Sequence, residues 1–134
     1  MTTYVRLRVA SESYAMPVLH VLEVTGLGDV AAVPGSRPEM LGVRNVRGRI
    51  LPVVDLAVLL GIPRRAPPGR LIIAEAGERQ ACFAVEAVSE VGEMDPPTEE
   101  TLSDLLIGAA LAGGDLVGVI DVPGVFDSLE RAQW

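Results

Sequence analysis

The apolar residues of this chain fall in short runs, and turn-forming residues interrupt these runs about every ten positions. Segment 5–9 alternates valine or leucine with arginine, which is the period-two pattern of a half-buried strand. Gly113-Gly114-Asp115 separates the apolar runs 107–112 and 116–120, as expected for a tight hairpin. The chain is therefore predicted to be mainly all-β, a barrel or sandwich with small helical additions.

Capping and turn residues add two short helices and one boundary to this prediction. Asp55 is placed to cap a short helix that runs through Leu60, and Pro123 begins a predicted C-terminal helix over 123–132. The basic, Pro-rich segment 63–69 is typical of an exposed loop. A chain of 134 residues is expected to form a single domain, 1–134, and this loop is the predicted boundary between its two lobes.

A charged turn on an apolar base lies within residues 42–56. Arg44, Arg47 and Arg49 surround Gly48, and seven apolar residues flank them. Glycine permits turn conformations that other residues avoid, and the planar guanidinium of an arginine binds a carboxylate with two parallel hydrogen bonds. Such a segment is typical of a solvent-facing recognition loop on a β scaffold.

Two roles are open for Arg47. It either contacts a partner protein or forms an internal ion pair, with Glu23 or Asp55, that braces the hairpin. Gly42 is expected to allow a close approach of the backbone, which is a structural role first.

The charge of the chain limits its partners. The formal net charge is −7, which makes nucleic acid an unexpected partner. Residues 1–67 hold 8 arginines and 5 acidic residues, a net charge of +3, whereas residues 68–134 hold 3 arginines and 13 acidic residues, a net charge of −10. Two interpretations of this division are open: an ordinary solvated face, or a docking surface for an acidic or polar protein with a second, acidic surface for a different partner.

The residues do not provide a catalytic or metal site. His20 is the single histidine and Cys82 the single cysteine, each within an apolar run, and the chain has no lysine. A Walker-type phosphate loop requires lysine, and zinc sites are mostly built from several Cys or His residues. We therefore expect a non-catalytic binding module without cofactor or metal. A signal peptide and an apolar run of about 20 residues are also not found, so a soluble, cytoplasmic protein without direct membrane insertion is expected.

Taken together, the motifs resemble those of CheW, the coupling protein family of bacterial chemotaxis, over nearly the whole chain. The central block is the most specific when taken whole. The matching segments are Tyr14-Ala15-Met16-Pro17-Val18, Leu41-Gly42-Val43, Asn45, Arg47-Gly48, Ile50-Leu51-Pro52-Val53-Val54-Asp55-Leu56, Ala84-Val85 and Leu116-Val117-Gly118-Val119-Ile120-Asp121. Arg44 departs from the family pattern, which has an apolar residue there, so it is expected to add a third charge near the turn.

The resemblance implies two SH3-like β-barrels that share a hydrophobic joint and a protein without enzymatic activity; a crossing of the N-terminal strand into the second barrel is left open. It implies a scaffold that couples transmembrane chemoreceptors to a CheA-type histidine kinase. The cytoplasmic tip of the receptor is expected between the barrels, and the regulatory domain of the kinase on the barrel ends. The protein-binding residues expected on this basis are Val21, Glu23, Val24, Arg44, Asn45, Arg47, Gly48, Val85 and Val88.

Two alternatives remain open from the sequence. One is a CheW-like scaffold in a non-flagellar chemosensory pathway, such as twitching motility or gene regulation. The other, less favoured because His, Cys and Lys are scarce, is a β-barrel that binds a small ligand.

Overall fold

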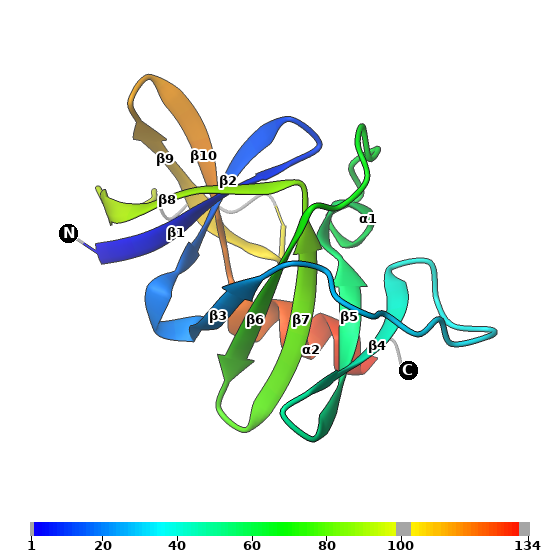
Figure 1. Ribbon diagram of the computed structural model, residues 1–134. Coiled ribbons are helices and arrows are strands. Elements are labelled where there is room, and N and C mark those ends of the chain that lie inside the picture. Colours follow the sequence, from blue (N-terminus) through cyan, green and yellow to red (C-terminus); the bar gives the residue numbers. More distant parts are fainter. Residues whose placement is uncertain (1, 99–102, 132–134) are drawn as a thin grey trace.

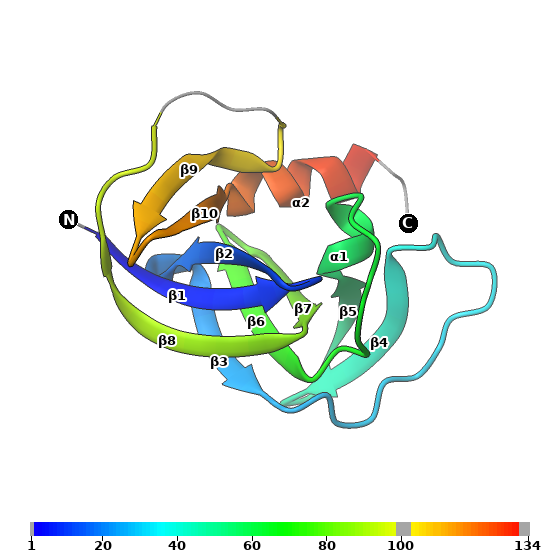
Figure 2. The same cartoon turned by 90° about the horizontal axis from the view of Figure 1, so that it is seen from above.

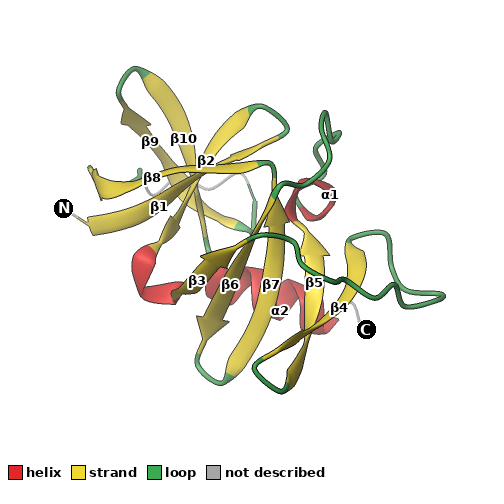
Figure 3. Cartoon of the chain, in the orientation of Figure 1, coloured by secondary structure: helices red, strands yellow, loops and turns green. Residues whose placement is uncertain are grey.

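Ten strands form two five-stranded sheets in the computed structural model, which describes residues 2–98 and 103–131 (Figure 1). The first sheet has the order β8-β1-β2-β10-β9, and the second has the order β3-β6-β7-β5-β4. Three short helices join or cover them, so the described chain is mostly strand (Figure 3). The strands are β1 (Thr2–Val9), β2 (Glu12–Pro17), β3 (Val21–Thr25), β4 (Met40–Val46), β5 (Arg49–Asp55), β6 (Arg70–Ala76), β7 (Arg79–Val85), β8 (Ala87–Met94), β9 (Leu106–Ala112) and β10 (Asp115–Ile120), and the helices are η1 (Val18–His20), α1 (Leu56–Leu59) and α2 (Val122–Arg131).

Each sheet curls around its own small core. The terminal barrel, built from β1, β2, β8, β9 and β10, encloses Tyr4, Ala15, Met94, Ala110, Val117 and Val119. The central barrel, built from β3 to β7, encloses Leu51, Val53, Leu71, Ile73, Cys82 and Ala84. These residues alternate along their strands with residues that point out of the barrel, because successive side chains of a strand face opposite sides.

A third and larger core joins the two barrels. The outward-facing side chains of β1 and β2 in the terminal barrel meet those of β5, β6 and β7 in the central barrel. Helix α2 leaves β10 of the terminal barrel but runs behind β6 and β7 of the central barrel (Figure 1), where its apolar face is buried. The joint core includes Leu7, Val9, Tyr14, Met16, Val54, Ile72, Phe83, Val85, Val125, Phe126 and Leu129. The prediction of two SH3-like barrels with a hydrophobic joint is confirmed.

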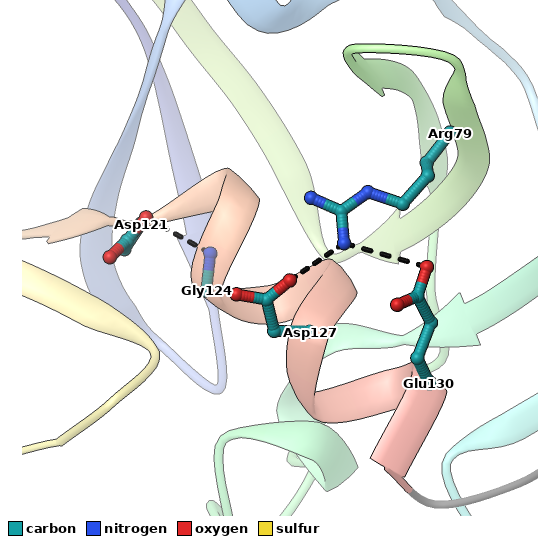
Figure 4. Close-up of polar contacts among 5 residues, drawn as sticks. All are labelled: Arg79, Asp121, Gly124, Asp127 and Glu130. Atoms are coloured by element: carbon teal, nitrogen blue, oxygen red, sulfur yellow. Dashed lines mark hydrogen bonds and ion pairs between the residues drawn. The ribbon is translucent and has the colours of Figure 1, made fainter.

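Polar contacts fix the C-terminal helix at both ends (Figure 4). The Gly124 N–H donates to Asp121 Oδ1 at 3.0 Å, which satisfies one of the free amides of the first turn. Farther along α2, the guanidinium of Arg79 on β7 lies 2.7 Å from Asp127 Oδ1 and 3.5 Å from Glu130 Oε1. The same guanidinium lies over the ring of Phe126, with 5.3 Å between Cζ and the ring centroid.

The other local predictions are also met. The β9–β10 hairpin forms at the predicted glycine turn. Asp55 caps α1, since Asp55 Oδ1 accepts from the N–H groups of Ala57 at 3.1 Å and Val58 at 3.4 Å. The helix itself ends at Leu59, one residue earlier than expected. Helix α2 is present, and Ala132 at its predicted end lies outside the described residues.

The predicted lobe boundary is wrong. The Pro-rich loop 63–69 joins α1 to β6 inside the central barrel. The chain instead changes barrels at η1 and again at Glu86, because β1 and β2 pair with β8 and β10 of the terminal barrel. Proline and basic residues correctly indicate an exposed loop. The chain passes from one barrel to the other in short segments between apolar strands, and the composition of those segments does not distinguish them from other turns.

Candidate protein-docking surfaces

The charged turn joins β4 to β5 and is held in one conformation. Val46 pairs with Arg49, which leaves Arg47 and Gly48 as a two-residue loop with φ angles of 50° and 86°. Positive φ at both central residues is the geometry of a type I′ hairpin turn, which glycine adopts easily and arginine rarely. The Gly48 N–H donates to Asn45 Oδ1 at 2.9 Å and fixes the turn further. Asn45 and Gly48 therefore shape the turn that displays Arg47.

The base of this hairpin is held by a second contact. Residues Ala31 and Val43 exchange two backbone hydrogen bonds, each 2.9 Å, so the segment after β3 pairs with the free edge of β4. A Cβ atom on Gly42 would collide with the carbonyl oxygen of Ala31. Gly42 therefore permits the close approach that was expected of it, and this approach closes the central barrel.

Arg47 forms an ion pair across the mouth of the central barrel. Its Nη2 lies 3.0 Å from Glu23 Oε2 on β3, and the two side chains are 76% and 38% exposed. Of the two pairings that the sequence left open, the one with Glu23 is formed, while Asp55 pairs with Arg64 at 3.1 Å. An ion pair this exposed contributes little to stability. Most of the Arg47 guanidinium stays accessible to a partner.

Arg44 does not extend the charge of the turn, contrary to expectation. Its Nη1 donates to the carbonyl oxygen of Gly26 at 3.0 Å, and its guanidinium packs against Gly28. The residue pairs with Leu51, a core residue of the central barrel, so the side chain starts on the inward face of β4. Arg44 is placed by the face of β4 from which its side chain leaves, not by its nearness to the turn in sequence. Arg44 holds the segment after β3 in place.

The valines expected to bind a partner divide into two groups. Val21 and Val24 on β3, and Val88 on β8, are partly buried against the joint core. Strands β3 and β8 are edge strands of different barrels and lie on the side of the molecule away from α2 (Figure 2). Val85, in contrast, is only 2% exposed within the joint core, so its place among the protein-binding residues is wrong.

Exposed apolar residues on the same strands were missed by sequence reasoning. Leu19 in η1, Leu22 on β3 and Val91 on β8 are all exposed, together with Val18. Both strands contain a register shift, between Val21 and Glu23 on β3 and opposite Arg6 and Leu7 on β8. A bulge changes which side chains face the core, so simple alternation assigns these residues to the wrong side. We call the partly buried valines and these exposed residues the joint surface: Val18, Leu19, Val21, Leu22, Val24, Val88 and Val91.

The titratable groups do not form a reactive site within residues 2–98 and 103–131. Burial raises the pKa of the Cys82 thiol, and Arg44 opposes this effect only in part, so the thiol stays protonated. Burial and the hydrogen bond to Glu12 raise the pKa of Tyr14. No group of three or more His, Cys, Asp or Glu side chains in the same described residues is arranged to hold a metal ion.

The CheW-like domain family matches residues 3–130. The chain belongs to this family. Chemotaxis protein CheW of Rhizobium meliloti is 30% identical over 134 residues, which cover 92% of this chain and 86% of that protein. Protein FrzA of Myxococcus xanthus is 32% identical over 119 residues, covering 87% and 72% respectively.

A solved structure agrees with this assignment. The scaffolding protein TtCheW from Thermoanaerobacter tengcongensis superposes with a TM-score of 0.80 and 28% identity, over 90% of this chain and 88% of that one. CheW-like proteins are non-catalytic scaffolds of chemotaxis that interact with chemoreceptors and CheA, and this chain is a CheW-like adaptor. Within the described residues, the helices lack the length and apolar character of a membrane span.

Proposed function

We propose that this protein couples transmembrane chemoreceptors to a CheA-type histidine kinase. It would act at receptor arrays on the cytoplasmic side of the membrane. The observation that carries the proposal is the joint surface, where two edge strands from different barrels each pack valines against the shared core and leave further apolar side chains exposed.

The joint surface suits the helical tip of a receptor. An amphipathic helical surface binds through apolar anchors in a groove with polar borders. In this proposal Val21, Val24 and Val88 supply the apolar anchors, and the Glu23–Arg47 pair supplies polar groups next to Val24 on β3. Arg47 has a dual role in this proposal, because its pair with Glu23 orients a guanidinium that remains available to a receptor carboxylate or carbonyl.

The substitution Arg47→Ala tests that role. It removes one exposed ion pair, so the protein is expected to remain folded while receptor-kinase assembly weakens. Arg37→Ala is a control, because the 54% exposed side chain of Arg37 also pairs with a glutamate, Glu39 at 2.8 Å, and lies outside the joint surface. Equal losses of stability and binding in Arg47→Ala would assign the residue to bracing alone.

A non-flagellar chemosensory pathway is the second candidate. It is supported by the match to Protein FrzA, a relative whose name does not contain chemotaxis. Both candidates require coupling of a receptor to a kinase. They differ in the cellular response that the kinase controls. Deletion of the gene followed by separate assays of swimming and surface motility distinguishes them.

A further inference from the structure

The central barrel has a seam between β3 and β4. These strands are the opposite edges of their sheet, since β3 forms its ladder with β6 and β4 forms its ladder with β5. The barrel closes through segment 26–31, which leaves β3 and crosses to β4 (Figure 1). Leu27 and Val30 of this segment pack against the core of the central barrel. The last residue of the segment forms the Ala31–Val43 bridge, so closure of the barrel depends on how this segment is held.

Arg44 crosses the seam at the point where β3 ends. Strand β3 ends at Thr25, and Arg44 Nη1 on β4 donates to the carbonyl oxygen of the next residue, Gly26, at 3.0 Å. A Cβ atom on Gly28, whose φ is 60°, would lie 2.8 Å from Cζ and Nη2 of Arg44 and 2.9 Å from its Nε. The guanidinium thus fills the space that a side chain at position 28 would need. Arg44 and a residue larger than glycine at position 28 therefore exclude each other.

Two other contacts across the seam hold the end of β3 less directly. The pair of Arg47 with Glu23 is largely exposed, so it contributes little to stability. The backbone bridge to β4 lies at the far end of segment 26–31. The hydrogen bond of Arg44 has a charged donor, which makes it stronger than a neutral one, and the residue is half-buried, so salt screens it less. It is the contact best placed to fix Val24 on the joint surface.

We propose that Arg44 is a positioning residue for receptor binding, which fastens the end of β3 to β4 and so fixes the orientation of Glu23 and Val24 before the receptor arrives. This inference rests on the proposed function, in which β3 contributes to the receptor-binding surface. Without the hydrogen bond to Gly26, the end of β3 must be ordered as the receptor binds, and that ordering lowers the affinity. Arg44 therefore acts on the receptor through β3 and not by direct contact.

The receptor affinity of Arg44→Leu tests the inference. Leucine keeps an apolar stem at position 44 but cannot donate to Gly26. Binding to the receptor's cytoplasmic fragment is measured by calorimetry, and we expect it to weaken about three- to tenfold, the cost of ordering one short segment. Amide hydrogen exchange over residues 23–28 should be faster than in the wild type, and binding of the receptor fragment should slow it again. Val85→Ala is the control, because it loses stability in the joint core without changing the seam.

A double-mutant cycle with Gly28→Ala tests the contact itself. In the presence of Arg44 the new Cβ displaces the guanidinium, so Gly28→Ala should weaken receptor binding as much as Arg44→Ala does. In the Arg44→Ala protein the same change should have no further effect on the affinity, because the space is then free. The strain of alanine at a positive φ is present in both backgrounds and cancels in the cycle.

Salt and stability separate positioning from its alternatives. The difference in affinity between the wild type and Arg44→Leu should persist at high salt, and its disappearance there would overturn the inference in favour of a direct charge contact. An equal loss of affinity in Val85→Ala would assign the effect to stability and also overturn it. Wild-type affinity in folded Arg44→Leu would overturn the inference and leave the coupling function intact, whereas failure of the wild type to bind the receptor fragment would overturn both.

Discussion

Substitution of Gly42 by alanine should open the central barrel at a defined cost. The new Cβ would collide with the carbonyl oxygen of Ala31, so the Ala31–Val43 bridge and its two hydrogen bonds must break. Each backbone hydrogen bond contributes about 1 kcal/mol net, and the positive φ of 155° at Gly42 adds strain of about 1 kcal/mol for alanine. The expected loss in the free energy of unfolding is therefore about 3 kcal/mol.

Urea unfolding followed by circular dichroism measures this loss, and Gly35→Ala is the matched control. Gly35 also has a positive φ, of 75°, but a Cβ there would meet no atom within 4 Å. The control should lose only the strain of about 1 kcal/mol, so the difference of about 2 kcal/mol reports the bridge. Equal losses in the two variants would refute the view that Gly42 is needed for the close approach that closes the barrel.

Three further predictions concern the core, the ion pair and pH. Val85→Ala should lower the free energy of unfolding by about 2 kcal/mol through lost burial, while leaving receptor binding by the folded protein unchanged in a pull-down. A double-mutant cycle of Arg47→Ala and Glu23→Gln, measured by urea unfolding, should give a coupling below about 1 kcal/mol, and a larger value would show that bracing dominates. The pKa of Tyr14 is higher in the folded state than its ordinary value of about 10. The contribution of Tyr14 to the free energy of unfolding should therefore be fully present below pH 10 and be lost as the pH rises further. Tyr14→Phe should reduce this alkaline loss in a pH series of thermal melts, and an unchanged profile would contradict the cause assigned to it.

Local features of the structure were accessible from the sequence. Hairpins at glycine turns, the Asp55 cap and the β4–β5 turn each depend on a few neighbouring residues whose preferences are strong. The Glu23–Arg47 pair was one of two open pairings, and complementary charge was sufficient to name it. The family resemblance supplied the two-barrel architecture.

Long-range pairing and side-chain direction were not accessible in the same way. Pairing of Tyr4 with Gly92 joins the first strand to one far along the chain, and no local pattern encodes it, so the lobe boundary was placed in the wrong loop. The burial of Val85 and the exposure of Leu116 depend on which face of a strand meets the joint. Register shifts in β3 and β8 change which residues of these strands face the joint core, and the composition of the strands does not reveal the shifts.

Reconstitution of receptor, kinase and this protein tests the central claim most directly. Autophosphorylation of the kinase is measured in the presence of receptor-containing membranes, with and without the purified chain and with the Arg47→Ala variant. The account predicts that receptor control of the kinase requires the chain and is reduced in the variant. Full receptor control without the chain, or no change on its addition, would contradict the account.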